Sequence, residues 1–128
     1  MNGKHPNGIL TYTASAACDK GTPVKFTGET DANGRPTITP TTATTDAAIG
    51  VTETECAAGD EVAVGILGSY TGTMLVEAGG AVTVGANVSP TGTAVTSGLT
   101  IGVALDAATA SGDLIELAHC VPFTLAAG

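Results

Sequence analysis

One segment of the chain occurs twice, and this repeat constrains the possible fold more than any other feature. Residues 49–64, IGVTETECAAGDEVAV, align with residues 101–117, IGVALDAATASGDLIEL, once one residue is inserted before the second Gly-Asp pair. Glycine suits a turn position with positive φ, and an aspartate can accept hydrogen bonds from backbone amides one or two residues further on. We therefore expect each copy to contain a turn that leads into a β-strand.

Two further segments, residues 16–26 and 76–88, carry the same pattern of small residues, a turn glycine and an alternating strand. The first apolar residues of the four expected strands are Val24, Val62, Val82 and Leu114. Because the chain is short and the units are unequally spaced, the pattern predicts a small β-barrel or β-sandwich rather than a long solenoid.

The apolar residues recur with a period of two, which predicts an all-β fold. Runs rich in β-branched residues predict strands over residues 22–28, 60–68, 80–88, 99–105 and 113–121. Asn33-Gly34 predicts a tight hairpin turn within residues 30–37. The Thr-rich segment 37–46 is expected to be a connector, and residues 105–111 are expected to form a turn or a single helical turn.

The domain organisation expected from these patterns is an arm followed by one body. Residues 1–16, with Asn-Gly at positions 2–3 and 7–8, are expected to form an extended N-terminal arm with a strand around residues 10–14. Residues 17–128 are expected to form a single β domain. The chain has two Phe, two Tyr and no Trp, so its core must be built from small aliphatic side chains. Such a core favours extra burial against a partner, and hence self-association.

The charges are distributed unevenly along the chain. The four basic residues, Lys4, Lys20, Lys25 and Arg35, lie in the first 35 positions, and nine acidic residues follow without a base. Such an acidic body would repel phosphate backbones, which argues against a nucleic-acid partner. The cations either contact an acidic surface, of this chain or of another protein, or are simply solvated.

No signal peptide is recognisable, and no apolar run approaches the ~18 residues that cross a bilayer, so no membrane partner is expected. The three cysteines, Cys18, Cys56 and Cys120, are odd in number and widely spaced, which argues against a disulfide framework. We interpret them as small buried residues of a protein made in a reducing cytoplasm. Three cysteines still allow one disulfide bond between two of them.

Catalytic and metal-binding patterns are missing from the sequence. His5 lies in the expected arm, and His119 and Cys120 are neighbours in an expected strand, where their side chains would point to opposite faces. Asp60, Glu61, Asp113 and Glu116 belong to the repeated turn motif and lack the spacing of a calcium loop. We therefore expect no enzyme activity, no cofactor and no metal site.

The order of motifs over residues 49–117 resembles the capsid decoration, or head cement, proteins of tailed bacteriophages. The resemblance is carried by IGV, AAGDEVAV, AGGAVTVGANVSPTGTA and SGLTIGVALDAATASGDLIEL, with weaker support from TYTASAACDKGTPVKF nearer the start. It covers a little over half of the chain and implies a β-tulip-like fold. The Thr-rich segment 37–45 has no counterpart in the family pattern.

The resemblance implies a virion protein, made in the host bacterial cytoplasm, that binds the outer surface of the expanded capsid and bridges major capsid protein subunits, commonly as a homotrimer. The family often lays an extended N-terminus against the capsid. We therefore hypothesise that residues 1–12 and the cations meet an acidic capsid surface. The predicted contact residues are Lys4, His5, Tyr12, Lys20, Lys25 and Arg35. The alternatives are a head-fibre or receptor-binding module, and a small hydrolase or metal-dependent enzyme.

Overall fold

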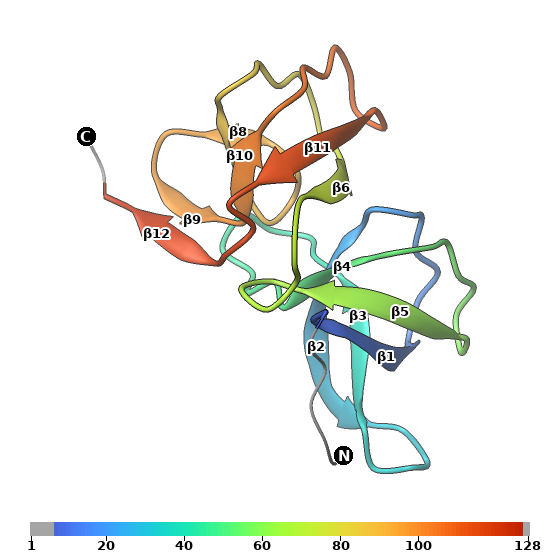
Figure 1. Ribbon diagram of the computed structural model, residues 1–128. Helices are drawn as coiled ribbons and strands as arrows, with labels where there is room; N and C mark the ends of the chain where they lie inside the picture. The colour runs from blue at the N-terminus through green and yellow to red at the C-terminus, as the bar shows by residue number, and fades with distance from the viewer. Residues whose placement is uncertain (1–6, 127–128) are drawn as a thin grey trace.

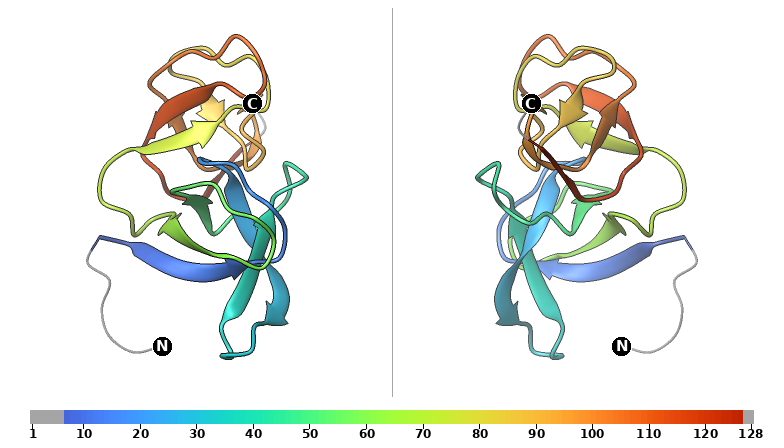
Figure 2. Two further views of the ribbon diagram at one scale, coloured as in Figure 1. Left: turned by 90° about the vertical axis from the view of Figure 1, so that its right-hand side faces the viewer. Right: turned by 90° about the vertical axis from the view of Figure 1, so that its left-hand side faces the viewer.

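The computed structural model describes residues 7–126, and these residues form strands and no helix (Figure 1). The all-β prediction is therefore confirmed. The strands divide into two lobes that are stacked end to end in Figure 1 and in both side views of Figure 2. The strands are β1 (Ile9–Ala14), β2 (Pro23–Thr30), β3 (Pro36–Pro40), β4 (Gly50–Thr52), β5 (Glu61–Ile66), β6 (Met74–Glu77), β7 (Asn87–Val88), β8 (Ala94–Val95), β9 (Gly98–Thr100), β10 (Gly102–Ala104), β11 (Leu114–Ala118) and β12 (Phe123–Leu125).

Lobe 1, formed by β1 to β5, is a closed barrel with the strand order β1-β3-β2-β4-β5. Strand β1 closes it, because β1 pairs antiparallel with β5 and parallel with β3. Alternate residues point inward and form a core that includes Tyr12, Ala14, Val24, Ile38, Val62 and Val64. This alternation is the period of two in the sequence.

Lobe 2 is formed by β6 to β12. Its main sheet has the order β6-β11-β10-β7-β8, and β9 and β12 form a separate two-stranded ribbon near the C-terminal end (Figure 1). The core contains Val76, Val88, Ile101, Ile115 and Leu117, each at most 1% exposed. Ala48 and Val51 of lobe 1 belong to the same core, so the two lobes share buried surface.

The two lobes are copies of one five-stranded unit. If β1, β5, β4, β2 and β3 are matched with β6, β11, β10, β7 and β8, the neighbours within each sheet are the same. The registers also agree. Val51 pairs with Gly65 in lobe 1 as Val103 pairs with Ala118 in lobe 2, and Tyr12 pairs with Val62 as Val76 pairs with Ile115. The sequence repeat is therefore a structural repeat of a whole lobe.

The repeated Gly-Asp turns have the same hydrogen bonds in both lobes. Gly59 and Gly112 adopt positive φ values of 88° and 96°, and their amides donate to the carbonyls of Ala14 and Ala78, both at 2.8 Å. The predicted turn is thus confirmed. The aspartate side chains accept from amides that precede them, not from those that follow as predicted: from Ala57 in lobe 1, and from Thr109 and Ala110 in lobe 2.

The lobes differ in the length of one hairpin. The β2–β3 hairpin of lobe 1 turns at residues 31–34, where Gly34 has a φ of 81°, and it is long enough for β3 to reach β1. The matching β7–β8 hairpin turns after only two paired residues. Lobe 2 is closed at this point by one hydrogen bond, from the Gly79 amide to the Gly92 carbonyl at 3.0 Å.

Several sequence expectations are corrected by this architecture. Residues 37–40, expected in a connector, belong to β3, because Ile38 is fully buried in the barrel. Of residues 80–88 only Asn87 and Val88 form a strand, and Val82 makes an isolated bridge with Ala108. The last long strand stops at Ala118, because His119 has a φ of 54°.

The N-terminal arm expected over residues 1–16 overlaps the barrel. Residues 1–6 lie outside the described residues. Strand β1 pairs with β5 from Ile9 to Thr13, and Tyr12 and Ala14 point into the core. The strand expected around residues 10–14 is therefore present, but it belongs to the barrel wall and not to an arm.

Candidate interaction surface

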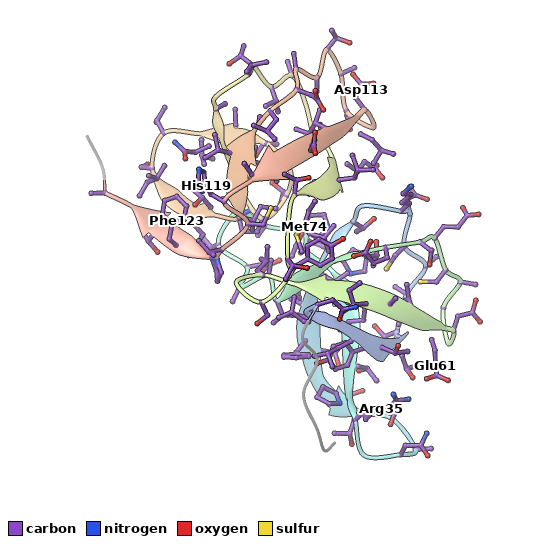
Figure 3. All side chains as sticks on the ribbon, viewed as in Figure 1. Arg35, Glu61, Met74, Asp113, His119 and Phe123 are labelled. Carbon is purple, nitrogen blue, oxygen red and sulfur yellow. The ribbon has the colours of Figure 1, made fainter. Side chains whose placement is uncertain are left out.

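The residues considered for catalysis are dispersed over the structure. His119 is exposed and Cys120 is buried, as expected, although both residues follow the end of β11 and do not belong to a strand. Asp60 and Asp113 cap turns in different lobes, and Asp113 lies at the far end of lobe 2, well away from Glu61 (Figure 3). Within residues 7–126, no three His, Cys, Asp or Glu side chains are grouped so that they could hold a metal ion. A search of the same residues found no helix long and apolar enough to cross a membrane.

Two of the predicted contact cations are bound to the chain's own carboxylates. Lys25 Nζ lies 3.1 Å from an Asp46 oxygen, and Arg35 Nη2 lies 2.8 Å from an oxygen of Glu61 (Figure 3). The Arg35 guanidinium also lies 3.8 Å from Asp31. Lys25 thus links β2 to the turn before β4, and Arg35 links the β2–β3 hairpin to β5.

The other predicted contacts are distributed differently. Lys20 is exposed and lines a pocket at the lobe junction with Val51, Glu53 and Leu75. Tyr12 is only 5% exposed, and its ring meets Phe26 edge to face at a centroid distance of 5.6 Å. Because Tyr12 lies in the barrel core, its side chain is not available for the predicted capsid contact. Lys4 and His5 lie outside the described residues.

Asp46 stabilises the turn before β4. Amide donation from Thr42 and Ala43, together with Lys25, lowers the pKa of Asp46 to about 2. Because the folded-state pKa lies below its ordinary value of 3.8, the carboxylate contributes stability above pH 4, which is lost as the pH falls towards 2. Asp46→Asn is expected to flatten the dependence of the urea midpoint on pH across this window.

The measurement is a set of urea unfolding curves followed by circular dichroism between pH 2 and 5. Glu29→Gln is the control, because Glu29 is an exposed carboxylate on β2 without an ion pair among the described residues. An unchanged pH slope in Asp46→Asn, or an equal change in both variants, would contradict the assignment.

The cysteines are all free thiols, and two of them face each other across a β-bridge. Cys18 and Cys56 exchange both backbone hydrogen bonds, at 3.0 and 2.9 Å. Burial and the neighbouring Cys56 raise the pKa of the Cys18 thiol to about 12, and burial raises the pKa of the Cys120 thiol. Because thiolates are the reactive species, iodoacetamide at neutral pH is expected to alkylate the half-buried Cys56 first.

Peptide mapping by mass spectrometry after timed alkylation measures this order. Cys56→Ser should leave a protein that alkylates at least ~10-fold more slowly. Equal labelling of Cys18 and Cys56 in the folded protein would show that the β-bridge between these two residues opens readily.

An exposed apolar surface lies on the outer face of lobe 2. Three residues lie side by side on this face: Leu105, directly after β10, Glu116 of β11 and Leu75 of β6. The Leu105 amide donates to the Glu116 carbonyl, and Glu116 pairs with Leu75. Leu114 lies two residues before Glu116 in β11, so it points to the same face, opposite Glu77. Val84 precedes Gly85, whose amide donates to the Ala104 carbonyl next to Leu105. We call Leu75, Val84, Leu105 and Leu114 the outer patch.

The outer patch combines exposed apolar side chains with nearby negative charge. Leu75, Leu105 and Leu114 are 44–46% exposed and Val84 is 65% exposed. The carboxylates of Glu77 and Glu116 lie on the same face, and residues 67–126 contain four acidic residues and no Lys or Arg. The sequence analysis missed this surface. The signal was present in the repeat, where Leu114 of one copy aligns with Glu61 of the other.

The comparisons with known proteins agree with this architecture. A family model described as phage cement protein matches residues 4–119. The search of curated proteins returned no significant match. Among solved structures, the base of the head fibre protein gp8.5 of bacteriophage phi29 matches with a TM-score of 0.63 and 17% identity, over 92% of each chain. The family match covers both lobes and nearly the whole sequence, and the chain belongs to the phage cement protein family.

Proposed function

We propose that this protein is a structural component of a phage virion that decorates the capsid and stabilises it by bridging neighbouring major capsid subunits. The single observation that carries the proposal is the family match over residues 4–119, which spans both lobes. In this role the protein acts through binding, and it needs neither a catalytic centre nor a cofactor.

The mechanism is thermodynamic linkage. A protein that binds the expanded shell and not its precursor stabilises the expanded state by an amount that grows with occupancy, about 2.7 kcal/mol for each site at a free concentration of 100 times Kd. Many copies on one capsid add these modest contributions. Binding on the outer surface, with self-association into a trimer at three-fold positions, would let each unit hold several subunits at once.

A second candidate is the base of a head fibre. The match to the phi29 head fibre base over 92% of each chain favours it, because the whole two-lobed architecture is similar. Both candidates require attachment to a phage head. They differ in whether the bound protein reinforces the shell or mainly presents another segment at its surface.

The test is to mix the purified protein with undecorated expanded heads and with unexpanded precursor heads, pellet the particles, and count the bound copies. Saturable binding to expanded heads, together with a higher temperature of capsid disruption, is the expected result. Saturable binding without any gain in capsid stability would favour the fibre base. Absence of binding to either particle would overturn the proposal.

A further inference from the structure

The repeat allows each position on lobe 2 to be compared with an equivalent position on lobe 1. Through the shared strand registers and the aligned turns, the outer patch residues Leu75, Val84, Leu105 and Leu114 correspond to Thr11, Lys20, Glu53 and Glu61. Lobe 1 therefore forms the same sheet with four polar residues at these positions. Folding of the unit does not require apolar side chains there, so their presence in lobe 2 needs another explanation.

In lobe 1 the matching face is already a contact surface. Val51 points away from the barrel core into the core of lobe 2 and is 3% exposed. A Cβ on its partner Gly65 would lie 2.8 Å from Met74 Cε and 2.9 Å from Tyr70 Cδ1, so these side chains sit directly on that face. The equivalent pair in lobe 2, Val103 and Ala118, is only half-buried. Tyr70 and Met74 thus cover this face of lobe 1, whereas Val103 and Ala118 leave the same face of lobe 2 partly exposed.

The charges around the outer patch restrict what covers it. Glu116 stands between Leu105 and Leu75, Glu77 stands opposite Leu114, and the Glu116 amide is held by Asp106 at 3.0 Å. Burial, and after it the nearby carboxylate of Asp19, raise the pKa of Glu77. Lys20 lines a pocket with Leu75, but the carboxylates of Asp19, Glu77 and Glu116 outnumber it. Two copies of this face would therefore repel each other, and an anionic lipid surface would repel this face. A protein surface with an apolar centre and a cationic rim is complementary to it.

We propose that the outer patch of lobe 2 is the docking surface of this protein, and that its partner is a capsid-protein surface with an apolar centre and surrounding Lys or Arg residues. The inference rests on the proposed function, because it identifies the face through which capsid attachment takes place. It reverses the electrostatic sense of the sequence-based hypothesis, in which cations of this chain met an acidic capsid.

The test is a triple variant in which lobe 2 receives the residues of lobe 1: Leu75→Thr, Leu105→Glu and Leu114→Glu. Because lobe 1 folds with these residues at the same positions, the variant is expected to keep its circular dichroism spectrum. The new carboxylates stand beside Glu116 and opposite Glu77, where lobe 1 has Ala63 and Thr13, so a fall in melting temperature that added salt reduces is expected. Its affinity for expanded heads should fall by at least about 100-fold, since central apolar side chains supply most of the binding free energy of an interface. Leu105→Glu alone is the fallback if the triple variant does not fold.

The matched control carries Val121→Glu and Phe123→Glu, which add the same charges at two apolar positions of similar exposure, 43% and 36%, before and within β12. This control should bind heads as the wild type does. Glu116→Gln should weaken the salt dependence of binding, because it removes a charge from the docking surface.

The outcomes separate the two proposals. If the wild type fails to bind heads, the proposed function is wrong. If the wild type binds and the triple variant binds equally well, or the control alone loses binding, the docking surface is wrong. Sedimentation of the free protein tests a second copy as the occupant. A wild-type oligomer that the triple variant reduces to monomers, with capsid binding retained, would overturn the inference.

Discussion

Val51→Asp is expected to destabilise the protein by about 3–5 kcal/mol, whereas Val103→Asp should cost about 1 kcal/mol. The two valines are equivalent residues of β4 and β10, with the same register to the neighbouring strand. Val51 is 3% exposed in the core shared by the lobes, so a carboxylate there would be buried without a partner. Val103 is only half-buried, so a carboxylate at that position can remain partly hydrated.

Urea unfolding at pH 7 measures both changes, and the pair is its own control because the substitution and the strand register are the same while the burial differs. Lowering the pH should restore part of the stability that Val51→Asp loses, since a buried carboxyl group is tolerated better when it is protonated. Equal losses in the two variants would show that lobe 2 does not cover the outer face of lobe 1 in solution.

The repeated turns could be predicted because their cause is local. A glycine with positive φ and an aspartate that caps the preceding amides act within a few residues, so the Gly-Asp pairs at 59–60 and 112–113 are visible in the sequence. The closure of lobe 1 was not predictable in this way. Strand β3 carries one fully buried residue, Ile38, between threonines, and its pairing with β1 joins segments more than twenty residues apart.

The partners of the predicted contact cations could not be read from the sequence for a related reason. The charge pattern drew attention to Lys25 and Arg35, but their partners Asp46 and Glu61 lie 21 and 26 residues further along the chain. Only the fold shows that these cations are neutralised within lobe 1. Leu105 and Leu114 look like core residues of strands in the sequence, and the register is needed to place them on the outer face.

Gly50→Ala is expected to be the most damaging of the alanine substitutions at glycines in β4 and β10, with a loss of about 3 kcal/mol and a fall in Tm of about 10 °C. A Cβ at Gly50 would lie 2.4 Å from the Gly65 carbonyl oxygen and 2.6 Å from Val64 Cγ1. The first contact is with backbone, so no side-chain rotation relieves it. The β4–β5 pairing, which joins the barrel to the lobe junction, would have to move.

The repeat supplies a graded series for this prediction. At the equivalent Gly102, a Cβ would lie 3.0 Å from the Ala118 carbonyl oxygen, so Gly102→Ala should cost less than Gly50→Ala. Gly80→Ala, where a Cβ meets no atom within 4 Å, should change Tm by no more than a few degrees. Thermal unfolding followed by circular dichroism gives the order. Equal losses in Gly102→Ala and Gly50→Ala would show that the closer approach of β4 to β5 in lobe 1 does not cause the loss of stability. Both copies of the unit would then require glycine at this position for a shared reason.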